Sequence, residues 1–143
     1  MGRRRLKWTS SSPEETMDIG RMIGQMLQAG DLLCLFGDLA AGKTTLIKGI
    51  VQGVNGLDPH LVSSPTFVYL HPYEGVGKVV YHFDLYRLRG AADFLQLGFE
   101  EYFFSEGVCC IEWSERIEEM IPPSAYRLNL EVVGEFKRNI CLS

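Results

Sequence analysis

The feature that most constrains this chain is the segment Gly37–Thr44, which has the form G-x-x-x-x-G-K-T. It follows the apolar run Leu32–Phe36, which is typical of a buried central strand, and it leads into a helical pattern over residues 43–54. The motif is specific when it joins such a strand to a helix. Its glycines let successive N–H groups point at phosphate oxygens, and the helix N-terminus adds partial positive charge. The segment therefore predicts a Walker A loop that binds a nucleoside triphosphate.

Individual positions of this loop have expected roles. Gly37 and Gly42 provide the backbone curl, Lys43 supplies a full charge to the β- and γ-phosphates, and Thr44 offers its hydroxyl to Mg²⁺. No N-K-x-D string occurs in the chain, which disfavours GTP.

Two carboxylates occupy matching places further along the chain. Asp84 follows the strand-like stretch Lys78–Phe83, and Glu112 follows Val108–Ile111. If both strands run parallel to the loop strand, both acids emerge at the edge of the sheet where open α/β folds bind ligands. One acid could then hold Mg²⁺, and the other could orient or deprotonate an attacking water.

Three neighbouring features each allow two interpretations. His82 shares a strand face with Asp84, so it either packs in the core or orients a residue of the site. Trp113 either stacks on a nucleotide base or a partner, or it anchors the core. The turn at Ser63–Phe67 is either an ordinary turn with a proline or a switch that senses the γ-phosphate.

The remaining pattern indicates an α/β fold, a P-loop NTPase-like single domain over residues 1–143 with a mixed central sheet flanked by helices. A capping box at Ser12–Glu15 starts a helix that is expected to stop near Gly30. Further strands are expected at residues 66–71, 126–132 and 135–142, and helical stretches at 91–97 and 114–120. Strand order does not follow from the sequence.

Composition points to a globular protein of the cytoplasm. The four cysteines lie in apolar strand-like stretches without metal-site spacing, so we expect reduced core thiols, with Cys109 and Cys110 on opposite faces of one strand. The net charge of −4 disfavours direct binding of nucleic acid over the whole surface. The basic residues near the start are expected to belong to a flexible tail over residues 1–8. No apolar run approaches the length of a membrane span, so no membrane partner is expected.

Beyond these single features, the order and spacing of several motifs resemble the TsaE (YjeE) family. The resemblance rests on the loop together with three later strings, Ser64–Phe67 (S-P-T-F), His82–Leu88 (H-F-D-L-Y-R-L) and Ile111–Glu115 (I-E-W-S-E), and it covers nearly the whole chain. It implies a small bacterial ATPase that serves the synthesis of threonylcarbamoyladenosine, a modified adenosine beside the anticodon of tRNA. Such a protein acts with TsaD-like and TsaB-like subunits, meets tRNA only through that complex, and hydrolyses ATP weakly alone.

The same resemblance implies roles for particular residues. Thr44 and Glu112 would contact Mg²⁺, Asp84 would be needed for hydrolysis, and Glu115 and Arg138 would help to hold the nucleotide. The phosphates would be lined by Ala40, Ala41, Gly42, Lys43, Thr44 and Thr45. Ala40 departs from the glycine usual in the family, and a Cβ would strain the loop by roughly 1 kcal/mol if that position needs a positive φ.

Two other functions remain open from the residues alone. A small-molecule kinase would also use a phosphate loop, with Arg87 and Arg89 as the clustered candidates for a lid. A nucleotide-gated binding module would bind the nucleotide without essential hydrolysis.

Overall fold

The computed structural model describes residues 5–37, 42–62 and 69–143. Its centre is a seven-stranded sheet in the order β1-β7-β6-β2-β5-β4-β3. The inner strands β6 (Tyr126–Val132), β2 (Leu32–Gly37), β5 (Val108–Glu112) and β4 (Val80–Asp84) run parallel. The outer strands β3 (Leu70–Tyr73), β7 (Arg138–Leu142) and β1 (Leu6–Ser10) pair antiparallel to their neighbours. The predicted mixed central sheet of an α/β fold is therefore confirmed.

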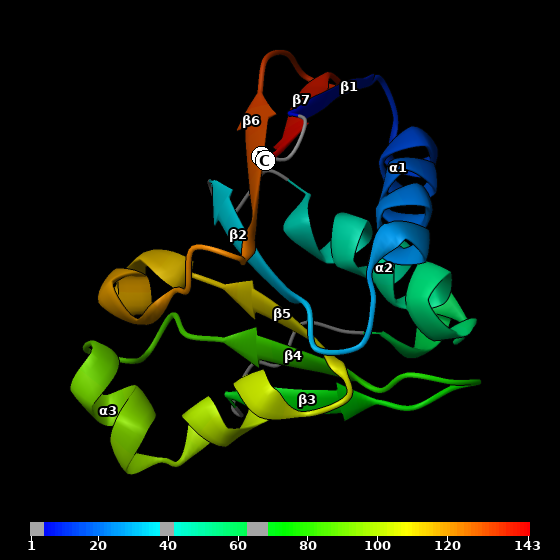
Figure 1. Cartoon of the computed structure of the whole chain (residues 1–143). Helices are drawn as coiled ribbons and strands as arrows, with labels where there is room; N and C mark the ends of the chain where they lie inside the picture. Colours follow the sequence, from blue (N-terminus) through cyan, green and yellow to red (C-terminus); the bar gives the residue numbers. More distant parts are fainter. Residues whose placement is uncertain (1–4, 38–41, 63–68) are drawn as a thin grey trace.

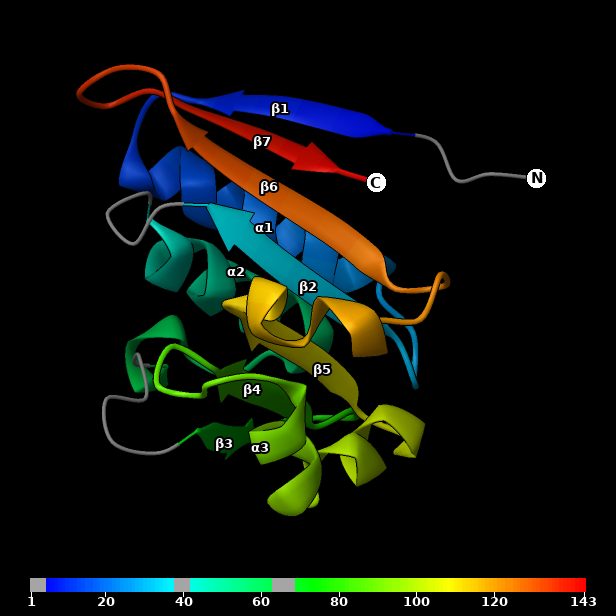
Figure 2. The same cartoon turned by 90° about the vertical axis from the view of Figure 1, so that its left-hand side faces the viewer.

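Helices cover the sheet on both faces, as Figure 1 shows. On one face lie α1 (Pro13–Met26) and α2 (Lys43–Asn55), and on the other lie α3 (Ala91–Gln96) and the 3₁₀ helices η3 (Phe99–Phe104) and η4 (Ser114–Met120). A short 3₁₀ turn, η2 (Pro59–Leu61), follows α2. Figure 2, turned by 90°, shows the strands fanning from β1 at one edge to β3 at the other. In the part of the chain that is described, no helix has the length and apolar character needed to cross a membrane.

Helix α1 begins as the sequence predicts and ends earlier. The Ser12 side chain accepts a hydrogen bond from the Glu15 N–H at 3.1 Å, while the Glu15 carboxylate accepts one from the N–H of Ser11. The helix stops at Met26 because Leu27 is extended and the Asp31 carboxylate accepts the N–H of Gln28 at 2.7 Å, which folds the next residues into a turn.

The sheet has a core on each face, and the cysteines follow the strand alternation. Cys110 belongs to the cluster under α1 and α2, whereas Cys34 and Cys109 belong to the cluster under α3 and the 3₁₀ helices, so the predicted opposite faces of Cys109 and Cys110 are confirmed. Burial raises the pKa of the Cys34 thiol to about 11 and that of Cys109 to about 12. These thiols stay protonated and act as apolar core groups.

Several predicted boundaries are wrong in instructive ways. Residues 6–8 belong to the edge strand β1, whose Trp8 is opposite Ile140 of β7, and not to a flexible tail. The last strand begins at Arg138 instead of Glu135, because residues 133–137 close a hairpin in which the Val133 N–H bonds to the Lys137 carbonyl. The helical stretch from Ser114 is a 3₁₀ helix that is kinked at Ile117. Residues 66–68 of the strand predicted at 66–71 lie outside the described residues, as does the predicted turn at Ser63–Phe67.

Candidate functional site

The phosphate loop lies between the end of β2 and the start of α2. Gly37, the last residue of β2, has φ +130°, and a Cβ atom built there would lie 2.4 Å from the carbonyl oxygen of Leu130 on the neighbouring strand. Gly42, the N-cap of α2, has φ +89° and carries no side chain that could bond to the first N–H groups of the helix. These N–H groups are therefore suited to an anion. Ala40 and Ala41 lie outside the described residues.

The Lys43 side chain is held against this loop. It is buried, and its Nζ atom donates a hydrogen bond of 2.9 Å to the carbonyl oxygen of Gly37. The same atom lies 4.9 Å from the centre of the Trp113 ring. Thr44 and Thr45 follow in the first turn of α2 and are half-buried. The charge and the hydroxyl groups expected at a phosphate site therefore lie together.

The two acids lie at the same edge of the sheet as this loop. Asp84 and Glu112 are the last residues of β4 and β5, and they are directly opposite each other in the parallel pairing. Strand β5 is in turn parallel to β2, so all three strands end on the same side. The strands therefore run parallel, as the sequence prediction required. Both acids are the last residues of their strands and do not belong to the turns that follow.

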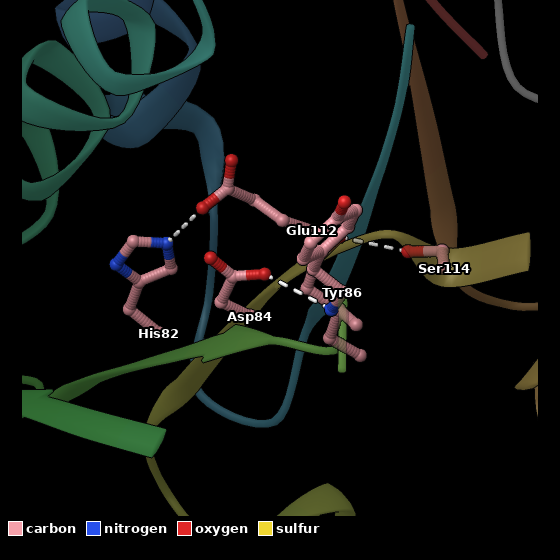
Figure 3. A network of polar contacts seen from close by, with 6 residues as sticks. His82, Asp84, Tyr86, Glu112 and Ser114 are labelled. Atoms are coloured by element: carbon pink, nitrogen blue, oxygen red, sulfur yellow. Dashed lines mark hydrogen bonds and ion pairs between the residues drawn. The ribbon is translucent and has the colours of Figure 1, made fainter. Parts of the chain in front are cut away.

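A buried hydrogen bond links one acid to a histidine, as Figure 3 shows. The Nε2 atom of His82 lies 2.7 Å from Oε2 of Glu112, and the two side chains are 1% and 6% exposed. His82 precedes Asp84 by two residues on the same face of β4. His82 is therefore both packed in the core and hydrogen-bonded to Glu112, so it meets the geometric requirement of each interpretation from the sequence.

Asp84 lies in a different environment. Its Oδ1 atom accepts the N–H of Tyr86 at 3.1 Å, and its own N–H donates to the Tyr69 carbonyl. Burial raises the pKa of Asp84 above its ordinary value, and the charge of Glu112 adds to the rise, while the Tyr86 N–H and the charge of Lys43 oppose it. A half-buried carboxyl with a raised pKa is suited to exchange a proton.

Trp113 has a backbone conformation that the sequence does not reveal. It is the one residue other than glycine with positive φ among the described residues, at φ 60° and ψ 42° directly after Glu112. Its half-buried ring packs beside Tyr86, with ring centres 5.0 Å apart, and beside the Arg116 guanidinium at 5.4 Å. The left-handed backbone costs about 1–2 kcal/mol in a residue with a side chain, and such strain is common at functional sites.

Arg138 and Glu115 differ in how they relate to the loop. Arg138 lines a small hollow of about 80 Å³ together with Gly42 and Thr45, and its Nη1 atom donates to carbonyl groups of the β6–β7 hairpin. Glu115 is exposed in the first turn of η4, and no hydrogen bond or ion pair within the described ranges joins it to the loop. The structure therefore brings Arg138 beside the start of α2, and it places Glu115 three residues after Glu112.

The donor chemistry of this edge fits Mg²⁺. A hydroxyl from Thr44 and a carboxylate from Glu112 are hard oxygen ligands of the kind that Mg²⁺ prefers. Among the described residues no group of three or more His, Cys, Asp and Glu side chains could hold a metal ion by itself. Mg²⁺ commonly binds through one or two protein oxygens together with substrate phosphates, and this arrangement suits that mode.

Comparisons with known proteins match almost the whole chain. The family model described as threonylcarbamoyl adenosine biosynthesis protein TsaE matches residues 10–140. A relative in Bacillus subtilis named tRNA threonylcarbamoyladenosine biosynthesis protein TsaE is 38% identical, over 96% of this chain and 84% of the relative. A protein of the same name in Treponema pallidum is 36% identical, over 96% of this chain and 100% of the relative. The crystal structure of Bacillus subtilis YdiB aligns with a TM-score of 0.79 and 34% identity, over 97% of this chain and 84% of that chain.

Proposed function

The chain belongs to the TsaE family, and from this premise we propose that it is an ATPase required for the synthesis of threonylcarbamoyladenosine in tRNA. The observation that best supports ATP hydrolysis is that two sets of functional groups lie at the same edge of the sheet. Lys43 and Thr44 at the phosphate loop lie at the edge where Asp84 and Glu112 end their strands.

Each residue has a role that its surroundings suit. Lys43 neutralises the β- and γ-phosphates, and Thr45, Gly42 and Arg138 hold the nucleotide along the start of α2. Thr44 and Glu112 would hold Mg²⁺, which when bound would draw negative charge from the phosphate oxygens.

Activation of the attacking water is assigned to Asp84, the acid that does not hold Mg²⁺ in this proposal. Glu112 has one oxygen engaged by His82, whereas Asp84 accepts only the backbone N–H of Tyr86 among the hydrogen bonds of the described residues. We assign Asp84 to orient the attacking water and to accept its proton. Ala40, Ala41 and Glu115 are kept as nucleotide contacts on the family resemblance alone.

The partners follow from the family premise. We propose that the chain acts in the cytoplasm with TsaD-like and TsaB-like subunits and meets tRNA through that complex. The acidic net charge of −4 supports an indirect meeting with RNA. Hydrolysis by the isolated chain is expected to be slow and to rise when the purified partner heterodimer is added.

The decisive measurement is the rate of ATP hydrolysis with and without that heterodimer. In parallel, Lys43→Ala is expected to abolish nucleotide binding in a titration, while Lys48→Ala on the same helix leaves it unchanged. Unchanged affinity in Lys43→Ala would remove the basis of the proposal. A Glu112→Gln variant that lost hydrolysis but kept full cellular function would favour the binding module instead.

The kinase alternative has less support in the structure. Arg89 is one of the two candidates for a kinase lid. Its Nε atom lies 3.1 Å from Oδ2 of Asp93 in the neighbouring helix α3, so its charge is paired locally. ATP consumption that rose with an added metabolite, and that ignored the heterodimer, would nevertheless establish the kinase.

A further inference from the structure

The buried contact between His82 and Glu112 has a role beyond packing. We infer that His82 is a positioning residue that fixes the Glu112 carboxylate in one orientation, so that a single oxygen, Oε1, faces the cation of the bound nucleotide. This inference rests on the proposed function, because it assigns Glu112 to Mg²⁺.

Burial makes the histidine the decisive donor for this carboxylate. Glu112 is 6% exposed and the His82 ring 1% exposed, so water has little access to either group. The distance of 2.7 Å between Nε2 and Oε2 is that of a strong hydrogen bond to an ionised acceptor. A carboxylate that loses such a donor in a buried place must turn toward another partner or remain unsatisfied.

The strand pairing places the two side chains without help from any loop. His82 on β4 is opposite Cys110 on β5, and Glu112 is two residues beyond Cys110 on the same face. The contact therefore runs diagonally across neighbouring strands. Its geometry is set by the sheet.

The imidazole is itself held by its neighbours. The ring of Tyr73 on β3 stacks with it at 6.1 Å between ring centres, and Tyr73 is 3% exposed. The Asn55 side chain at the end of α2 donates to the Tyr73 carbonyl at 3.0 Å, which ties β3 to the helix that starts at the phosphate loop. The imidazole is therefore buried between the Glu112 carboxylate and the ring of Tyr73.

The hydrogen bond from His82 leaves one oxygen of the Glu112 carboxylate available to a cation. A carboxylate only accepts, so we assign the shared hydrogen to Nε2 of His82, and Nδ1 is buried without a partner among the described residues. Figure 3 shows the other oxygen of Glu112 facing away from the imidazole. With Oε2 engaged, Glu112 presents Oε1 as a ligand and does not chelate through both oxygens.

The test is to remove the donor and keep the ring. In His82→Phe, the affinity of the ADP-bound chain for Mn²⁺, measured by electron paramagnetic resonance as a substitute for Mg²⁺, is expected to fall 10- to 100-fold, the range typical when the partner of a metal ligand is lost. ADP affinity in the presence of EDTA is expected to stay unchanged. His82→Gln keeps an N–H donor and is expected to recover part of the loss.

The matched control is His71→Phe. His71 is opposite His82 on β3 and stacks on the same Tyr73, but it is exposed. Its replacement is expected to leave Mn²⁺ affinity unchanged. A purely structural role of His82 would lower thermal stability in His82→Phe with no change in Mn²⁺ affinity, and that result would overturn the inference.

A second measurement does not depend on the variants folding. In the nucleotide-free wild-type chain, a long-range ¹H–¹⁵N correlation spectrum of the imidazole is expected to show the His82 hydrogen on Nε2. A hydrogen on Nδ1 alone would overturn the inference. Failure of the proposed function is distinguishable, because the wild type would then show no hydrolysis even with the heterodimer, whatever His82 does.

Discussion

The two helical layers on the sheet pack through different residues, glycines on one face and aromatic side chains on the other. Between α1 and α2 the helix backbones touch: a Cβ atom built at Gly49 would lie 2.1 Å from the Met17 carbonyl oxygen, and one at Gly24 would lie 2.2 Å from that of Ile50. On the other face, aromatic rings meet with centres 5.4 to 5.9 Å apart. Those rings belong to Phe83, Phe94, Phe99, Tyr102 and Phe103.

This difference separates a rigid part of the site from an adaptable one. Helix α2 starts at the phosphate loop, and its backbone contact with α1 leaves no space for added atoms between the two helices. Most rings of the aromatic layer belong to the segment that joins Asp84 to Glu112, and side chains can repack there by tilting. We therefore expect the phosphate-binding side to tolerate change poorly and the segment between the acids to tolerate it better.

Among small changes in side-chain size, the largest effect is expected from one added methyl group between α1 and α2. Gly49→Ala should lower the free energy of unfolding by about 3 kcal/mol, although alanine favours a helix over glycine by about 1 kcal/mol, because the helices must move apart. Urea unfolding measures the change. Gln25→Ala, at an exposed position of α1, is the control and should change stability by less than about 0.5 kcal/mol. A neutral Gly49→Ala would contradict the close backbone contact.

A smaller loss is expected from a larger change in the aromatic layer. Phe94 is fully buried, yet Phe94→Leu should cost only about 1.5 kcal/mol, because neighbouring rings can close part of the space. Phe94→Ala leaves a cavity that they cannot close and should cost about 3–5 kcal/mol. The comparison between the layers fails if Phe94→Leu proves as destabilising as Gly49→Ala under the same denaturant conditions.

The smallest effect concerns the acid at the edge of the site. Burial raises the pKa of Asp84, so the folded chain binds this proton more tightly than the unfolded chain, and the stability that results is lost as the pH rises through the folded pKa. Asp84→Asn should therefore be slightly more stable than the wild type at neutral pH and gain nothing below the ordinary pKa of 3.8.

Thermal unfolding of both proteins across this pH range tests the sign. Asp58→Asn is the control, because Asp58 also accepts a backbone N–H, from His60, but is exposed. A gain in Asp84→Asn that persisted at pH values well below 3.8 would assign the effect to something other than ionisation.

Local patterns explain what could be predicted from the sequence. The apolar run into Gly37 and the helix start at Ser12 depend on neighbouring residues only, and both have the predicted form. The acids at Asp84 and Glu112 could be placed at strand ends for the same reason. The two strand ends lie at the same edge only if the strands run parallel, and the sequence does not determine strand direction.

Contacts between distant segments explain what could not be predicted. Strand β1 exists because Leu6 and Trp8 pair with a strand more than a hundred residues later, whereas Lys7 and the arginines before the strand locally suggest a tail. The bond from His82 to Glu112 depends on the register of β4 against β5. The left-handed backbone at Trp113 falls on a residue type that gives no hint of it.

The pairing of Asp84 with Glu112 has a consequence for how such chains can vary in length. Their spacing is the distance between neighbouring strands, about 4.8 Å, and it does not depend on the 27 residues that separate them in the chain. Insertions or deletions at exposed positions between residues 85 and 107 can therefore leave Asp84 and Glu112 opposite each other in the strand pairing. A single residue inserted in β4 ahead of His82 would instead turn His82 and Asp84 to the opposite face together.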